Sequence, residues 1–139
     1  QAQLLQKFEH LGKVEWVISG SDADLLAPAN QINIAHGDDH IRLQSTGHDP
    51  YLYLPPLDAP LQRAIVKIDI DAPGHSILQV FYATSDQLDY AEERSVCVPF
   101  YRGRNILLVE LPPGVTGRLR IDPGEIPGEY RIYRIEVRQ

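Results

Sequence analysis

Histidines and aspartates gather in one short stretch of the sequence, where their side chains could ligate a metal ion. The segment His36-Gly37-Asp38-Asp39-His40 is followed closely by His48-Asp49. Two histidines four residues apart make a good zinc pair on a helix, because both side chains then project from one face. This segment lies between two alternating runs and contains Gly37-Asp38, so a hairpin turn is the simpler interpretation.

Calcium suits the acidic side chains better than zinc does, because jelly-roll domains often hold this ion through carboxylate and carbonyl oxygens of their loops. The candidate ligands are Asp22, Asp24, Asp38, Asp39, Asp122 and Glu125. Of these we predict Asp38, Asp39 and Asp122 as metal ligands, with solvated surface acids as the alternative. No EF-hand pattern is present, and the sequence predicts no cofactor beyond such a structural calcium ion.

The sequence contains no recognisable catalytic motif. A glycosidase needs two carboxylates facing each other across a cleft. Asp89, Glu92 and Glu93 share one polar segment, but a solvated loop explains them more simply. No nucleophile elbow, Walker loop, dinucleotide fingerprint or His-Glu-x-x-His helix occurs. We therefore predict no catalytic residues and no enzyme activity, and a stand-alone hydrolase or lyase is the least favoured hypothesis.

Tyrosines and arginines could together bind a sugar. Aromatic rings stack on the apolar face of a pyranose, while planar polar groups take its hydroxyls. In Tyr51-Leu52-Tyr53-Leu54 the tyrosines alternate with leucines, so both point outward if the leucines are buried. The predicted ligand-binding residues are Tyr51, Tyr53, Tyr82, Arg42, Arg118 and Arg120. The alternative is that these tyrosines serve cross-strand packing, as they commonly do in β proteins.

Short alternating segments must position these residues. Leu4, Leu5, Phe8 and Leu11 form one apolar stripe that predicts a helix ending at Gly12. The rest of the chain consists of about nine or ten runs of four to eight residues, separated by Gly and Pro. We therefore expect an all-β, antiparallel β-sandwich of jelly-roll type with a short N-terminal helix. Residues 1–13 are the predicted helix or linker, and residues 14–139 the sandwich domain.

Two of these runs allow specific expectations. Gln31–Ala35 and Ile41–Gln44 should pair as a hairpin around the histidine- and aspartate-rich turn. In the last run, Ile132 cannot share a face with Ile135 and Val137 under strict alternation. Either a β-bulge lies near Tyr133-Arg134, or Tyr133 itself points inward.

Composition narrows the classes of partner. The 139 residues carry a formal net charge of -6, which argues against nucleic-acid binding because that depends on clustered Lys and Arg. The arginines of the C-terminal third alternate with apolar residues, which favours the solvent-facing side of two strands over an anion site. No apolar run is long enough to insert into a membrane. The oligomeric state stays open.

The single cysteine, Cys97, allows no intrachain disulfide. Its neighbours Val96 and Val98 favour a buried, small apolar role, and Trp16 is expected in the core. Because the chain begins with Gln, we expect a domain cut from a longer protein. A cytoplasmic location, or one peripheral to the bacterial inner membrane, is favoured.

Several short sequence motifs follow one another in a distinctive order. They are Thr46-Gly47-His48-Asp49-Pro50-Tyr51-Leu52-Tyr53-Leu54-Pro55, Leu78-Gln79-Val80-Phe81-Tyr82, Val98-Pro99-Phe100, Gly103-Arg104-Asn105, Leu111-Pro112, Leu119-Arg120-Ile121-Asp122-Pro123-Gly124, Gly128-Glu129-Tyr130 and Ile135-Glu136-Val137. Across residues 14–138 the chain resembles a β-sandwich accessory domain of bacterial glycosyltransferases and cell-surface polysaccharide proteins. That group is similar in layout to galactose-binding-like and carbohydrate-binding modules.

The resemblance implies a jelly-roll module that works beside a glycan-handling domain, and it assigns no ligand residues. The favoured hypothesis is a non-catalytic carbohydrate-binding or positioning module of a larger bacterial protein of polysaccharide biosynthesis. Its partners would be a glycan or the host glycosyltransferase domain. The alternative is a structural or protein-interaction domain that docks or oligomerises through its tyrosine-rich surface without binding glycan.

Overall fold

The computed structural model describes residues 2–139, which form one α-helix, eleven strands and two short 3-10 turns. In chain order these are α1 (Ala2–His10), β1 (Val14–Ser19), η1 (Ala23–Leu25), β2 (Ala27–Asn30), β3 (Ile32–His36), β4 (Ile41–Ser45), β5 (Tyr51–Tyr53), β6 (Ala64–Ala72), β7 (Ser76–Thr84), η2 (Glu92–Arg94), β8 (Ser95–Phe100), β9 (Gly103–Leu111), β10 (Val115–Asp122) and β11 (Gly128–Arg138).

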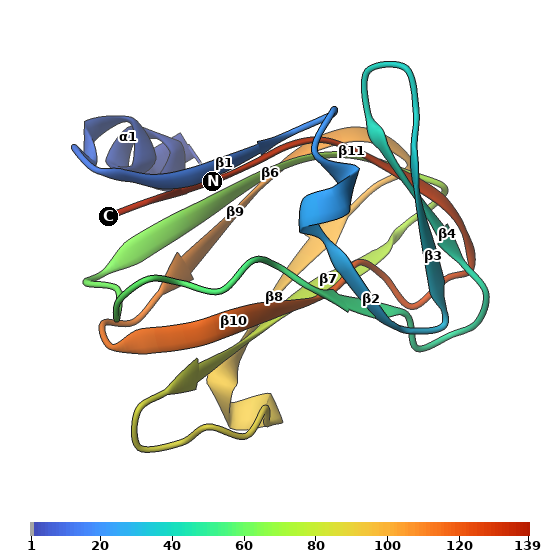
Figure 1. Cartoon of the computed structure of the whole chain (residues 1–139). Helices are drawn as coiled ribbons and strands as arrows, with labels where there is room; N and C mark the ends of the chain where they lie inside the picture. Colours follow the sequence, from blue (N-terminus) through green and yellow to red (C-terminus); the bar gives the residue numbers. More distant parts are fainter. Residues whose placement is uncertain (1) are drawn as a thin grey trace.

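The strands form two antiparallel sheets that pack face to face (Figure 1). Sheet A has the order β3-β4-β11-β6-β9, and β1 pairs with the C-terminal part of β11. Sheet B has the order β2-β5-β10-β7-β8. The chain crosses repeatedly from one sheet to the other, so strand pairing is largely non-local. The expected all-β sandwich with an N-terminal helix is confirmed.

The core lies between the sheets, where side chains of alternate positions meet. In β6, Val66, Ile68 and Ile70 are buried, while Lys67 and Asp69 point to the opposite face. The same alternation in the other long strands builds one continuous apolar cluster across both sheets. Because each strand commits one face to this cluster, its other face is free for solvent, a covering element or a ligand.

The last strand contains a β-bulge, which is one of the two arrangements expected from its sequence, the other being an inward Tyr133. Ile132 is paired with Ile70, but Arg134 is paired with Asp69, so β11 advances two residues where β6 advances one. The extra residue is Tyr133, and after it Ile135 and Val137 return to the buried face. The predicted hairpin of β3 and β4 is also present, with Ala35 opposite Arg42.

Helix α1 covers part of the outer face of sheet A (Figure 1). Phe8 is buried against Ile65 of β6 and Leu108 of β9, whose side chains would otherwise be exposed apolar positions on that face. The end of the helix is held electrostatically as well, because Arg138 donates to the Phe8 carbonyl oxygen at 3.3 Å. Among residues 2–139, no helix is both long and apolar enough to cross a membrane.

Strand β2 does not follow the alternation rule and was not expected from the sequence. It contains Pro28, which cannot donate a backbone hydrogen bond and is therefore confined to a sheet edge. In sheet B it pairs with β5, opposite Tyr51 and Tyr53. Trp16 of β1, which was expected in the core, is half-buried and packs against the core cluster.

Candidate functional site

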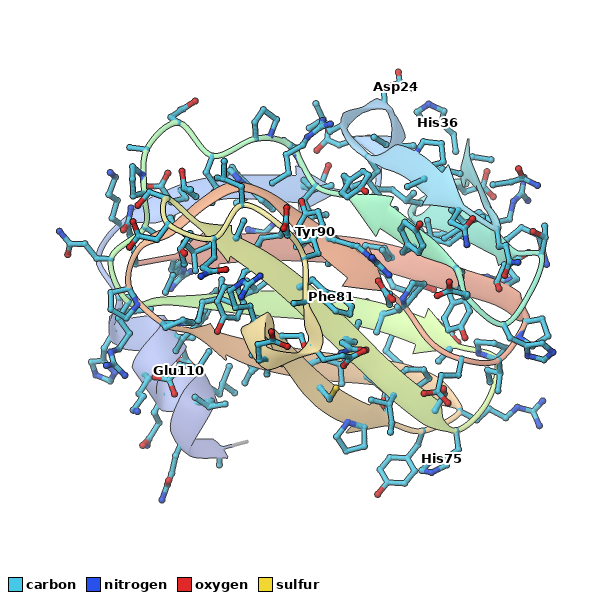
Figure 2. The ribbon with its side chains drawn as sticks, turned by 90° about the horizontal axis from the view of Figure 1, so that it is seen from below. Asp24, His36, His75, Phe81, Tyr90 and Glu110 are labelled. Carbon is cyan, nitrogen blue, oxygen red and sulfur yellow. The ribbon has the colours of Figure 1, made fainter. Side chains whose placement is uncertain are left out.

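The outer face of sheet B carries a groove of about 750 Å³. Strands β7, β8 and β10 form its floor, and the segment between β4 and β5, the segment after β10 and the turn η2 form its walls. The lining residues are His48, Asp49, Pro50, Ile77, Gln79, Phe81, Glu92, Cys97, Arg120, Asp122, Gly124 and Glu125. Figure 2 views the molecule from this side, with Phe81 and Tyr90 near the middle of the face. We refer to this feature as the groove.

Arg120 of β10 occupies the centre of the groove. Its backbone lies between Tyr53 of β5 and Phe81 of β7. The guanidinium carbon is 3.6 Å from the ring centroid of Tyr51 and 4.5 Å from that of Phe81. Nε and Nη2 donate to the two carboxylate oxygens of Asp122 at 2.9 and 3.0 Å. The arginine is therefore fixed by stacking and by a bidentate ion pair, which leaves it little freedom to lose when a ligand binds.

Asp122 is the most strongly desolvated carboxylate of the groove. Burial raises its pKa, and although the ion pair with Arg120 opposes this, the nearby Asp49 and Glu92 raise it further. Each Asp122 oxygen accepts one hydrogen bond from Arg120, and a carboxylate oxygen can accept another. A ligand hydroxyl that donates to Asp122 would thus replace a hydrogen bond from water that burial has removed.

Gln79 carries the polar surface from β10 to the far wall. Its backbone lies between Asp122 and Cys97. The side-chain nitrogen donates to Glu92 Oε2 at 2.7 Å and to Ser95 Oγ at 2.9 Å. These two bonds use the amide protons, and no hydrogen bond from residues 2–139 reaches the amide carbonyl oxygen, which is available to accept from a ligand. The groove therefore offers a row of acceptors that runs from Asp122 and Gln79 on its floor to Glu92 on its wall.

Aromatic contacts hold the long segment between β7 and β8 in place beside the groove. Tyr90 stacks on Tyr53 with ring centroids 5.8 Å apart and an interplanar angle of 24°. Its hydroxyl donates to the Arg118 carbonyl oxygen at 2.7 Å. Burial is the main reason that the pKa of Tyr90 is raised. This contact ties the loop to β5 and β10, and so it also places Glu92 at the groove wall.

The opposite wall is held by side-chain to backbone hydrogen bonds. Gln31 Oε1 accepts from the Asp49 backbone N–H at 2.9 Å, and Asn30 Nδ2 donates to the Asp49 carbonyl oxygen at 2.8 Å. Gln31 adopts φ of 48°, in the left-handed region that is costly for a residue with a side chain. A strained residue whose side chain fixes Asp49 indicates that the position of this wall is maintained at some conformational cost.

The end of β10 meets the core at a close approach. A side chain at Gly124 would collide with the Tyr130 hydroxyl group and the Phe100 ring. Tyr130 is fully buried, its hydroxyl donates to the Ile126 carbonyl oxygen at 2.7 Å, and burial raises its pKa to about 12. The turn that begins at Asp122 is therefore anchored to the core directly below the groove.

Negative charge dominates the groove. Four carboxylates line it, those of Asp49, Glu92, Asp122 and Glu125. Against them, the lining residues include one guanidinium group, that of Arg120. The pKa of the Cys97 thiol is raised by partial desolvation, although the residue is exposed, and the negative charges of Glu92, Glu125 and Asp122 raise it further. The same negative charges would repel an anionic ligand.

The structure separates the ligand-binding residues predicted from the sequence. Of these residues, Arg120 lines the groove, Tyr51 and Tyr53 lie beside it in contact with Arg120 or paired with its backbone, and Arg118 lies two residues before it on β10. Tyr82 packs against the hydrophobic core, on the opposite face of β7 from Phe81. Arg42 lies on β4 of sheet A, opposite Ala35 and Arg131, and belongs to a different surface.

The predicted metal ligands are also divided. Asp38 and Asp39 lie in the turn between β3 and β4, where Asp39 Oδ1 is 2.9 Å from His40 Nδ1. Asp122 lies in the groove on sheet B and is paired with Arg120. Among residues 2–139, no group of three or more His, Cys, Asp and Glu side chains is arranged to hold a metal ion.

Several groove residues were not singled out from the sequence. Gln79 and Phe81 alternate with Leu78 and Val80 of the core, so the pattern placed them on the outer face of β7, where Arg120 covers the Phe81 ring and leaves it 6% exposed. The buried role expected for Cys97 is wrong. The thiol is exposed on β8, because the neighbouring Val98 points inward and side chains alternate between faces. From the sequence, Glu92 was considered only as a glycosidase carboxylate and Glu125 only as a calcium ligand. Both lie outside the strands, where alternation gives no orientation.

Comparison with known proteins gives the fold a context. No family model and no curated protein sequence matches the chain. Solved structures do match over most of its length. The apo structure of BiXyn10A CBM1 has a TM-score of 0.64 at 11% sequence identity, covering 92% of this chain and 99% of that one.

Two further structures have the same architecture. The xylan-binding module CBM86 from Roseburia intestinalis has a TM-score of 0.58 at 12% identity, covering 91% of this chain and 95% of that one. CBM29_1 from Piromyces equi has a TM-score of 0.57 at 10% identity, covering 83% and 81%. The chain is thus a β-sandwich with the fold of carbohydrate-binding modules.

Proposed function

We propose that this domain is a non-catalytic carbohydrate-binding module that holds a glycan in the groove of sheet B. The observation that carries the proposal is the fixed cluster at its centre, in which Arg120 is stacked between Tyr51 and Phe81 and paired with Asp122. The cluster is organised before any ligand arrives and presents several hydrogen-bond acceptors to sugar hydroxyls. The fold shared with carbohydrate-binding modules supports the same function.

The charge of the groove favours a class of sugar. Four carboxylates line it, and its arginine is already paired with one of them. A uronate or sulfated sugar would meet unfavourable potential there, whereas the hydroxyls of an uncharged sugar can donate to the carboxylates. We therefore propose an uncharged glycan as the ligand.

The finer context rests on the sequence resemblance alone. We propose that the module belongs to a larger bacterial protein of polysaccharide biosynthesis, where it would bind glycan beside a glycosyltransferase domain. The fold neighbours include modules of polysaccharide-degrading enzymes, such as one in a xylanase 10B structure with bound xylohexaose. The full-length gene product decides this point. A glycosyltransferase domain next to the module supports the biosynthetic context, and a glycoside hydrolase domain contradicts it.

Calorimetric titration with uncharged oligosaccharides tests glycan binding. Xylo-, cello- and manno-oligosaccharides are suitable first ligands, with oligogalacturonate as the anionic comparison. Arg120→Ala should lower the affinity for the best uncharged ligand by at least about tenfold, which corresponds to about 1.4 kcal/mol. Arg104→Ala is the matched control, because Arg104 also pairs bidentately with an aspartate and stacks on a tyrosine, but on sheet A.

A second groove variant guards against a folding defect in the first. Gln79→Ala removes one acceptor from the groove floor and leaves the Arg120 cluster intact, so it should also weaken binding while circular dichroism and the melting temperature show a folded domain. Absence of binding to any glycan across a broad array would refute the proposal, and so would unchanged affinity in both groove variants. Preferred binding of oligogalacturonate would refute the uncharged ligand class.

A further inference from the structure

Two aromatic side chains, His75 and Tyr101, lie beyond the open end of the groove. His75 precedes β7 and Tyr101 follows β8, and their ring centroids are 5.4 Å apart at an interplanar angle of 35°. The adjacent pair Ser76 and Phe100 is buried, so alternation places His75 and Tyr101 on the outer face of sheet B. Figure 2 shows His75 at the far end of this face from Tyr90.

These rings continue a line of side chains that begins inside the groove. Along the paired strands β7 and β8, Gln79 lies opposite Cys97, and Ile77 lies opposite Pro99. The next outward pair is His75 and Tyr101. Ile77 is itself a groove residue with 43% of its surface exposed. The surface is therefore continuous from the polar floor through Ile77 and Pro99 to the two rings. We call the surface formed by His75 and Tyr101 the platform.

The platform supplies what the groove lacks. At the groove, Arg120 covers the rings of Phe81, which lines it, and of the neighbouring Tyr51, and Tyr53 is covered by Tyr90. Tyr101, in contrast, is 68% exposed. Isolated exposed apolar residues are normal on protein surfaces, but here an exposed ring adjoins further apolar surface at the mouth of a polar groove. Such a ring is suited to stack on the apolar face of a sugar.

The backbone at Tyr101 is held in place without help from a ligand. The Tyr101 N–H donates to Asn105 Oδ1 at 3.1 Å, and Asn105 Nδ2 donates to the carbonyl oxygens of Tyr101 and Gly103, both at 2.8 Å. Gly103 adopts φ of 97°, which favours glycine. The Asn105 amide thus closes the turn between β8 and β9 and limits the entropy lost when a ligand contacts Tyr101.

We infer that groove and platform form one binding strip for several consecutive units of an extended polysaccharide chain. The inference rests on the proposed glycan binding and adds the length of the ligand. Six residue-to-residue steps of extended chain lead from His75 to Phe81, which corresponds to a strip roughly 20 Å long. A sugar held at Arg120 would leave room for further sugar units along β7 and β8, and Tyr101 would contact one several units away.

The affinity for uncharged oligosaccharides of increasing length tests the strip. With the native chain, affinity should rise from disaccharide to hexasaccharide and then level off. Tyr101→Ala should lower the affinity for the longest oligosaccharide roughly fivefold and leave that for the disaccharide unchanged, because only the longer ligand reaches the platform. Tyr101→Phe, which keeps the ring, should behave as the native chain. Ile106→Ala, an exposed apolar position on sheet A, is the matched control.

The outcomes separate the platform from the groove. If the native chain binds long oligosaccharides and Tyr101→Ala matches it at every length, the platform is refuted while glycan binding stands. If Tyr101→Ala weakens the disaccharide as much as the hexasaccharide, Tyr101 belongs to the central site, and the extended strip is refuted. If the native chain binds no glycan of any length, the proposed function and the strip are both refuted.

Discussion

Two arginines on opposite faces of the sandwich make nearly the same contacts in different surroundings. On sheet B, Arg120 pairs with Asp122 and lies 3.6 Å from the Tyr51 ring centroid. On sheet A, Arg104 pairs with Asp69 at 2.6 and 3.0 Å and lies 3.6 Å from the Tyr133 ring centroid. The side chain of Arg120 is 19% exposed, however, and that of Arg104 is 55% exposed. The two arginines therefore differ in burial although their ion pairs and ring contacts are similar.

The surroundings differ because the two outer faces are finished differently. Sheet A is partly covered by α1, and its charged side chains pair with one another, as in Arg134 with Glu136 and Glu136 with Arg138. Sheet B is bordered by walls that stand at the edges of its face and leave a groove between them. We expect variants of sheet A to lose stability and variants of sheet B to lose the proposed binding, and variants on each face can test that division.

The largest effect should come from removing the contact that holds α1 on sheet A. Phe8 is 1% exposed, and its ring also receives the Arg138 guanidinium at 4.3 Å. Phe8→Ala should lower the free energy of unfolding by about 3 kcal/mol, because it leaves a cavity and exposes Ile65 and Leu108. Chemical denaturation measures this loss, and Val14→Ala, at an exposed position, is the control. An unchanged denaturation midpoint would mean that α1 contributes nothing to folding.

The next largest effect should come from the buried carboxylate of sheet A. Burial acts to raise the pKa of Glu136, but hydrogen bonds from Arg138 and Arg134 outweigh it, so the pKa is lowered from 4.5. Glu136→Gln should lower the free energy of unfolding by about 2 kcal/mol at neutral pH, because it leaves two arginines without their shared partner.

The pH dependence of this effect has a definite sign. A carboxyl group whose pKa is lower in the folded state stabilises the fold above its unfolded pKa, and this contribution is lost as the pH falls through the folded value. The difference between native and Glu136→Gln should therefore shrink as the pH falls below about 4.5. Denaturation curves between pH 7 and pH 3 measure it, with Glu93→Gln on the exposed loop as control. A difference that stays constant with pH would contradict the assignment.

The same contrast between faces explains how far the sequence could predict this molecule. Alternation within a strand separates the two faces, so the core positions of β6 and the bulge at Tyr133 could both be predicted. Strand β2 could not, because a short edge strand with a proline has no alternating pattern. The prediction that Cys97 is buried was wrong because it relied on the apolar character of the neighbouring valines rather than on alternation along β8.

The site was harder to predict than the fold because it is built across strands that are distant in sequence. Tyr53 and Arg120 are neighbours because β5 pairs with β10, and no pattern within either strand specifies that partner. Arg42 and Arg120 are equally alternating arginines, yet they lie on different sheets. Within β7, in contrast, alternation alone distinguishes the outward Phe81 from the core-packed Tyr82. The sequence could predict which types of residue would form a site, but the strand order determines which of those residues come into contact.

The smallest effect should come from Arg104, and it makes the comparison sharpest. Arg104→Ala removes an exposed ion pair and an exposed cation–π contact, and such surface contacts contribute little because solvent screens them. Melting temperature and glycan affinity should both stay within the scatter of the native chain. Arg120→Ala, with the same contacts removed, should lose affinity. If Arg104→Ala weakened glycan binding as much, the groove would not be the binding surface, and the division of roles between the two sheets would be wrong.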